Sequence, residues 1–83
     1  MGYTSEAMIE ELERVALAVD LPEYHLKAGD MGTVVDISAD RQQYTVEFFT
    51  LDGETFAVVP VAPAQIRRVG GREIAHARAL EAA

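Results

Sequence analysis

A turn-rich segment with two glycines, residues 21–35, constrains the fold of this chain more than any other feature. It reads Leu-Pro-Glu-Tyr-His-Leu-Lys-Ala-Gly-Asp-Met-Gly-Thr-Val-Val. Gly29 and Gly32 supply positive φ or close backbone approach where a side chain would clash. Asp30 is expected to accept hydrogen bonds from the turn backbone between these glycines. The segment therefore predicts a tight entry into a strand of a small, strongly bent barrel.

The remaining pattern predicts short strands separated by turns. Alternating apolar and branched residues indicate five strands, at residues 15–20, 31–37, 44–49, 55–61 and 66–69. Asp52 and Gly53 form a two-residue hairpin signal, and a single 3₁₀-like turn is expected at 64–65. A bulge at Gly32 would decide which of Val34 and Val35 points inward, and this choice stays open.

The two ends of the chain are expected to be helical. Met8, Ile9, Leu12 and Val15 recur at helical spacing, which predicts a short amphipathic helix over residues 5–13. The alanine-rich stretch after Gly71 suggests a second, loosely attached helix. We expect a helical extension over residues 1–14, a barrel over 15–69 and a tail over 70–83.

This order of elements predicts a mainly β fold, a small five-stranded SH3-like barrel with a short N-terminal helix and a C-terminal helix. A five-stranded OB-type barrel is the competing architecture, although these strands are short for it.

Composition narrows the classes of function. The 83 residues suffice for one domain with a modest core. The formal net charge of −7 disfavours nucleic acid and anionic lipid as partners. No cysteine is present, which removes thiolate chemistry and suits a cytoplasmic protein. No stretch is long and apolar enough for a membrane span, so no membrane role is expected.

Several residue groups resemble one known family. They are Val15-Ala16-Leu17, Asp20-Leu21-Pro22-Glu23, Leu26, Gly29-Asp30-x-Gly32-Thr33-Val34-Val35, Tyr44-x-Val46-Glu47-Phe48 and Leu51-Asp52-Gly53. The pattern is similar to that of an uncharacterised family of small bacterial proteins, the domain of unknown function 4926, over residues 14–69. The resemblance implies an SH3-like barrel and brings no catalytic residues.

A wider similarity is to the KOW-type element of ribosomal and transcription-elongation proteins. Its Gly-x-x-Gly-x-Val pattern matches Gly29, Gly32 and Val34. The resemblance implies an RNA- or ribosome-associated barrel as an alternative function. Asp30, Asp36 and Asp40 stand where an RNA-binding version would carry basic residues, and the available cations are Arg67, Arg68 and Arg72.

The sequence holds no recognisable catalytic constellation. His25 lies in the first long loop near Glu23, and His76 lies in the tail. Two histidines without metal-ligand spacing predict no metal site, and no cofactor motif is present. We expect the protein not to be an enzyme. Tyr24 and His25 are candidate loop contacts for a peptide, because SH3-like barrels bind peptides beside this loop.

The hairpin register predicts an apolar outer face. A two-residue turn pairs Phe49 with Phe56 and Phe48 with Ala57, so one face collects the barrel interior. The opposite face then carries the candidate interface residues Phe49, Leu51, Phe56 and Val58. Such a patch is covered within the chain, self-associates or binds a partner. Met8, Ile9 and Leu12, or Ile74 and Leu80, would cover it.

These observations favour a non-catalytic protein-interaction module that binds through its apolar outer face. The expected partner is another protein or a second copy, and the expected role is that of regulatory partner of another bacterial protein.

Overall fold

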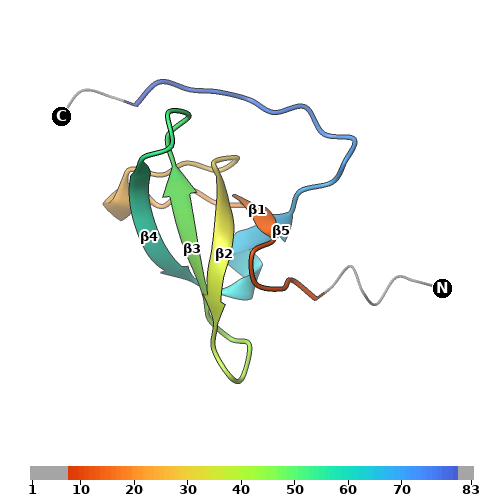
Figure 1. Cartoon of the computed structure of the whole chain (residues 1–83). Helices are drawn as coiled ribbons and strands as arrows, with labels where there is room; N and C mark the ends of the chain where they lie inside the picture. Colours follow the sequence, from red (N-terminus) through yellow and green to blue (C-terminus); the bar gives the residue numbers. More distant parts are fainter. Residues whose placement is uncertain (1–7, 81–83) are drawn as a thin grey trace.

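The computed structural model describes residues 8–80 as a single five-stranded antiparallel sheet with two short 3₁₀ turns (Figure 1). Its strands are β1 (Arg14–Leu17), β2 (Met31–Ile37), β3 (Tyr44–Phe49), β4 (Thr55–Val61) and β5 (Ile66–Arg68). The 3₁₀ turns are η2 (Pro22–Tyr24) and η3 (Pro63–Gln65). All five predicted strands are confirmed, with β1 shorter than expected, and so is the 3₁₀ turn before β5.

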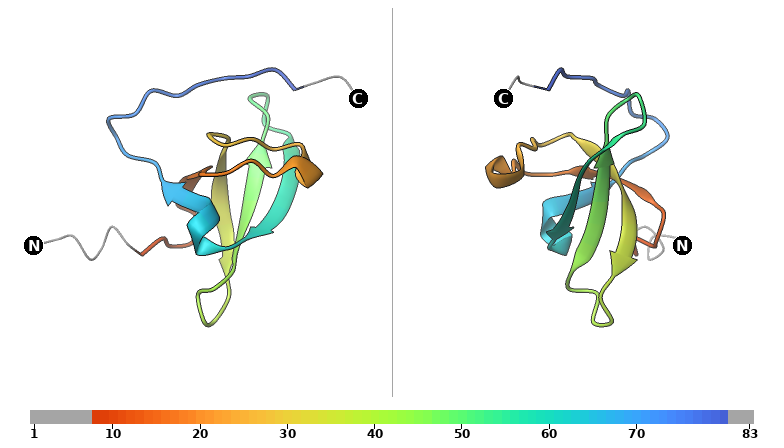
Figure 2. Two further views of the ribbon diagram at one scale, coloured as in Figure 1. Left: turned by 180° about the vertical axis from the view of Figure 1, so that it is seen from behind. Right: turned by 60° about the vertical axis from the view of Figure 1, so that its left-hand side comes forward.

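The strand order in the sheet is β4-β3-β2-β1-β5, with β4 and β5 at its two edges. The sheet bends strongly, so that β1 and β5 lie behind β2, β3 and β4 (Figures 1 and 2). It is not closed by hydrogen bonds between β4 and β5. The mainly β prediction is confirmed, and the five strands of the predicted SH3-like barrel form a bent antiparallel sheet that is not closed.

The interior of the bend holds the hydrophobic core. Tyr44, Val46 and Phe48 of β3 alternate into it, and Val59 and Val61 of β4 face them. This is the interior face that the hairpin pattern predicted. Val15 and Leu17 of β1, Val34 of β2 and Ile66 of β5 complete the strand contribution. β3 shows the period of two that a sheet with one buried face requires, whereas three consecutive residues of β1, from Val15 to Leu17, are buried.

Gly32 explains why the glycine-rich segment enters a strand here. A Cβ on Gly32 would lie 2.6 Å from Val46 Cγ1 and 2.7 Å from the Glu47 carbonyl oxygen. Close backbone approach, rather than positive φ, is therefore the reason for this glycine. Gly29 has φ of 93°, so it serves the turn itself. The bulge in β2 lies between Val34 and Asp36 rather than at Gly32, and it leaves Val34 buried.

The β3–β4 hairpin differs from the predicted two-residue turn. Thr50 and Glu54 pair through the Thr50 N–H, which enlarges the loop to Leu51, Asp52 and Gly53. Gly53 takes φ of 91°, as the last residue of a three-residue hairpin loop commonly does. Phe49 consequently pairs with Thr55 instead of Phe56, and a bulge then restores the predicted pairing of Phe48 with Ala57.

The expected N-terminal helix is wrong for its described part. Residues 8–13 form an irregular segment in which Leu12 has φ of 71°, a value outside the helical region. The Leu12 N–H donates to the Val34 carbonyl, and the Glu13 carbonyl accepts from the Val34 N–H. Sheet-like hydrogen bonding to β2 therefore overrides the helical spacing. Residues 5–7 of the expected helix lie outside the described residues.

The expected C-terminal helix is wrong in the same way. After a turn at Gly71 and Arg72, residues 73–80 run as an extended chain across the end of the sheet that carries the β3–β4 hairpin (Figures 1 and 2). A helix this short is marginal without packing on the rest of the domain, even when it is rich in alanine, and Ile74 and Leu80 stay exposed. Residues 81–83 lie outside the described residues.

Candidate interaction surface

An exposed apolar group lies on the outer face of β3 and β4 and on the tip of their hairpin. Phe49 is 47% exposed, Val58 is 53% exposed and Leu51, on the tip, is 96% exposed. We call these three residues the outer patch. Figure 1 views this outer face, and no described segment crosses in front of β3 and β4. The patch therefore stands open to solvent.

Phe56, the fourth predicted interface residue, is placed differently. The bulge that restores the strand register turns Phe56 toward the core, where its partly buried ring packs against the buried cluster. The predicted face thus loses one of its two aromatic rings. Sequence pattern alone could not show this, because the pairing of Phe49 depends on the length of the hairpin loop.

A carboxylate interrupts the outer patch. Glu47 lies between Thr45 and Phe49 on the same face of β3 and pairs across the sheet with Val58. Its carboxylate accepts a hydrogen bond from the Thr55 hydroxyl. The outer face is consequently mixed, with the Glu47 carboxylate and the Thr55 hydroxyl lying beside its apolar residues.

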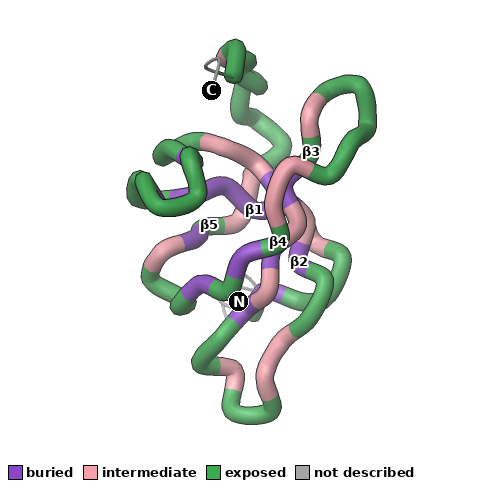
Figure 3. The backbone as a smooth tube through the Cα atoms, turned by 90° about the vertical axis from the view of Figure 1, so that its left-hand side faces the viewer, coloured by how far each residue is buried: buried purple, intermediate pink, exposed green. Residues whose placement is uncertain are grey.

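The segments expected to cover the patch lie elsewhere. Ile9 is buried in the core cluster, whereas Met8 and Leu12 are exposed. In the tail, Ile74 and Leu80 are exposed as well. Figure 3 shows exposed backbone along both the hairpin tip and the C-terminal tail. Among residues 8–80, the segments that were expected to cover the outer patch therefore do not cover it.

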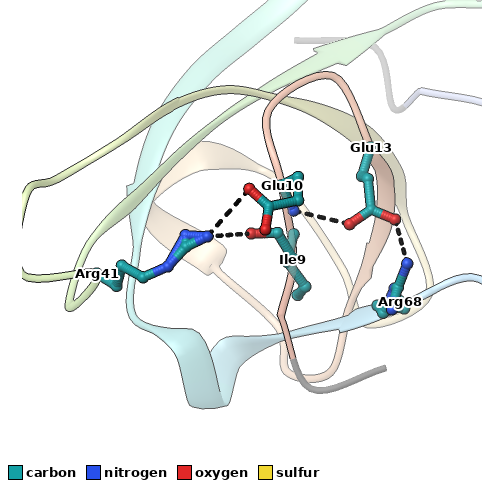
Figure 4. Close-up of polar contacts among 5 residues, drawn as sticks. All are labelled: Ile9, Glu10, Glu13, Arg41 and Arg68. Carbon is teal, nitrogen blue, oxygen red and sulfur yellow. Dashed lines mark hydrogen bonds and ion pairs between the residues drawn. The ribbon is translucent and has the colours of Figure 1, made fainter. Parts of the chain in front are cut away.

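Ion pairs connect the N-terminal segment to the loop between β2 and β3 and to β5 (Figure 4). The Arg41 guanidinium donates to the Ile9 carbonyl at 3.3 Å and to the Glu10 carboxylate at 3.1 Å. Glu13 accepts from the Glu10 N–H and from Arg68 of β5. The Glu10 backbone hydrogen bond and the Arg68 contacts outweigh desolvation, so the pKa of Glu13 is lowered. These contacts keep Ile9 seated in the core.

The first long loop presents Tyr24, His25 and Asp30, the residues that the sequence singled out there. Tyr24 ends the 3₁₀ turn η2 and is partly exposed, while His25 takes the left-handed conformation at φ of 60°. Asp30 accepts the Lys27 N–H at 2.9 Å. The expected role of Asp30 as a turn acceptor is right, but the donor lies before Gly29 rather than between the glycines.

Asp30 also binds an arginine from the far end of the chain. Arg78 donates from Nε to Asp30 Oδ1 at 2.9 Å and from Nη2 to Asp30 Oδ2 at 2.6 Å. The same Nη2 donates to the His25 carbonyl at 3.1 Å. Burial of the Asp30 carboxyl raises its pKa, but the Arg78 and Lys27 hydrogen bonds and charges outweigh burial and lower it.

Sequence reasoning missed Arg78 entirely. Its 48-residue separation from Asp30 leaves no local spacing pattern that would join them. The only signal in the sequence was a cation in the tail of an acidic chain, which does not identify a partner.

The described residues offer no other recognisable chemistry. Within residues 8–80, no group of three or more His, Asp or Glu side chains is arranged to hold a metal ion. No helix in that range is long and apolar enough to cross a membrane. Two of the three arginines expected to form a basic surface are ion-paired, Arg67 with Glu73 and Arg68 with Glu13.

The open, bent antiparallel sheet with two short 3₁₀ turns defines a small, mainly β protein. A family model, the domain of unknown function DUF4926, matches residues 11–68. Because this match spans more than half of the chain, the protein belongs to the DUF4926 family. It confirms the family resemblance seen in the sequence. No curated protein and no solved structure matches the chain significantly.

Proposed function

We propose that the protein is a non-catalytic protein-interaction module that binds another protein through the outer patch and acts as its regulatory partner. The observation that carries the proposal is the exposure of Phe49, Leu51 and Val58 on a face that no described segment crosses. Exposed apolar groups gathered on one face of a small domain support a contact surface, because a partner that covers them buries apolar area.

The partner's chemistry follows from the surroundings of the patch. Glu47 lies within it, and the chain carries a net charge of −7. A partner surface with an apolar centre and basic residues at the rim would bury Phe49 and Val58 while pairing with Glu47. This chain contains no cysteine, which is compatible with a reducing compartment. We therefore place the protein and its interaction in the cytoplasm.

The strand order supports assigning the bent sheet to the SH3-like barrel class. β5 follows the 3₁₀ turn η3 and returns beside β1, while β2, β3 and β4 form a meander. In this arrangement the outer face of β3 and β4 stays free of the crossover through η3. The RNA-binding alternative would use Arg67 and Arg68, and both are ion-paired with glutamates of the chain. We do not carry that alternative further.

The experiment compares Phe49→Glu with the matched control Ile74→Glu. Both replace an exposed apolar residue with the same charge, and Ile74 is 95% exposed in the tail and does not belong to the outer patch. Each tagged protein is incubated with an extract of its source organism, and recovered proteins are quantified by mass spectrometry. Sedimentation of the purified proteins reports self-association.

We expect one protein to be recovered in stoichiometric amount with the wild type and with Ile74→Glu, and to be reduced about tenfold or more with Phe49→Glu. A wild-type dimer that only Phe49→Glu dissociates would identify a second copy as the partner. Equal recovery and equal sedimentation for all three proteins would show that the outer patch is not an interface.

A further inference from the structure

We propose that the loop of residues 25–30 is a guanidinium-binding site, which Arg78 fills within the chain and an arginine of an extended partner segment fills in exchange. This site is separate from the outer patch, because it is built by the loop before β2. The inference therefore does not depend on the interface proposed above.

The acceptors of the site converge on a single guanidinium group. Both oxygens of Asp30 and the carbonyl oxygen of His25 accept from Nε and Nη2 of Arg78, at 2.6 to 3.1 Å. The side chains are largely covered, with 26% of Arg78 and 18% of Asp30 exposed. Two parallel hydrogen bonds to a carboxylate match the planar fork of arginine and do not match the ammonium of lysine.

The loop holds this geometry through bonds that do not involve the tail. The Lys27 N–H binds Asp30 Oδ2 at 2.9 Å, and the Ala28 N–H binds Asp20 Oδ1 at 2.8 Å. The Gly29 N–H donates to the Leu17 carbonyl at the end of β1. The left-handed conformation of His25 fixes the direction of its carbonyl group. These bonds position the acceptors independently of Arg78, which lowers the cost of binding a guanidinium group.

The tail, in contrast, is built as a replaceable occupant. It leaves β5 through Gly70 and Gly71, makes a turn in which Glu73 accepts the Gly70 N–H, and then runs extended. Arg78 is its one partly buried residue between positions 71 and 80, and the others are exposed. Glu73 anchors the start of the tail to Arg67 of β5, and beyond it Arg78 is the one partly buried side chain, so the part after Glu73 can be exchanged for another segment that carries a guanidinium group.

The charge of the molecule favours a cationic replacement. Because the protein has a net charge of −7, it attracts an arginine-bearing peptide to its surface from a distance. The apparent affinity of the loop for a partner's arginine is reduced by competition with Arg78. Because Arg78 is tethered, its effective concentration at the loop is about millimolar. A partner must therefore add contacts beside its arginine, or the tail must first be released.

The test measures binding of the tail sequence added as a separate peptide. The protein is the full chain carrying Arg78→Ala, which empties the site and leaves Asp30 and the loop unchanged. The peptide comprises residues 70–80, and the matched control peptide carries citrulline, the neutral isostere of arginine, at position 78. Amide NMR shifts of Lys27, Ala28 and Asp30 report occupancy of the loop.

We expect the arginine peptide to shift these three amides in Arg78→Ala, and to bind about tenfold more weakly to the wild type, whose site is filled. The citrulline peptide should leave them unmoved. Unmoved loop amides with the arginine peptide would overturn the proposal, as would equal shifts with the citrulline peptide. Both peptides keep Arg72 and Glu73, so they differ only in the charge and donor groups of the side chain at position 78.

Phe49→Glu serves as a second protein in the same titration. This substitution leaves the loop intact. The double variant Phe49→Glu, Arg78→Ala should therefore respond to the peptide as Arg78→Ala does. Loss of peptide binding through this change would place the arginine on the outer patch and overturn the assignment to the loop.

Discussion

At the scale of single residues, Gly32 occupies a position where β3 leaves no room for a side chain. Its neighbours at 2.6 and 2.7 Å are a branched side chain and a backbone carbonyl, and the carbonyl cannot move aside without disturbing the sheet. The sequence indicated that a glycine was needed in this segment. It could not indicate which of the two reasons for glycine applied, because the neighbour comes from a different strand.

Gly32→Ala is expected to lower the free energy of unfolding by about 1–3 kcal/mol, because the added methyl group overpacks the β2–β3 contact. Urea unfolding monitored by circular dichroism measures the change. Gly71→Ala is the matched control, since a Cβ there meets nothing within 4 Å. Equal stability of Gly32→Ala and the wild type would contradict the close approach of the two strands.

At the scale of elements, the strands were predictable and the terminal segments were not. Tyr44, Val46 and Phe48 alternate strictly, and the side that they share is buried as expected. The helical spacing of Met8, Ile9 and Leu12 was equally regular, but it was misleading. Hydrogen bonds with Val34 of β2 and the Arg41 contact to the Ile9 carbonyl decide the conformation of that segment. Local spacing carries no information on such distant partners.

The N-terminal segment is therefore expected to contribute to stability although it has no regular structure. Ile9 is 8% exposed and belongs to the core cluster, so Ile9→Ala should cost about 2–5 kcal/mol of unfolding free energy. Its neighbour Met8 is half-exposed, and Met8→Ala should change stability by no more than about 0.5 kcal/mol. Similar thermal unfolding of the two variants would show that the segment is not part of the core.

At the scale of the whole molecule, ion pairs connect both terminal segments to the rest of the chain. Glu13 binds Arg68, Asp30 binds Arg78 and Glu73 binds Arg67. All three carboxyl groups have lowered pKa values. For Glu73 the Gly70 N–H is the largest cause, followed by the hydrogen bond from Arg67. Three acidic groups, widely separated in the sequence, thus respond to pH in the same direction.

Acid should weaken the molecule through these groups. A carboxyl group whose pKa is lower in the folded state stabilises the fold above its ordinary pKa and loses that contribution as pH falls through the lowered value. The ordinary values are 4.5 for glutamate and 3.8 for aspartate. We expect the combined variant Glu13→Gln, Asp30→Asn, Glu73→Gln to be less stable than the wild type at about pH 6, with the difference shrinking toward about pH 3.

Urea unfolding of both proteins at several pH values measures this difference. The other carboxyl groups titrate in both proteins, so their contribution largely cancels. A constant difference across the acidic range would show that the three groups stabilise the fold without their charge.

The sequence by itself determined the five strands, the buried side of the β3–β4 hairpin and the family, because these depend on a period of two along the chain and on nearby turn residues. The tertiary structure alone decided the open edge of the sheet, the inward turn of Phe56, the path of both terminal segments and the pairing of Asp30 with Arg78. Each of these depends on groups that meet only after folding. A periodic pattern records which side of a strand is buried, but it does not record which distant backbone or charge lies beside it.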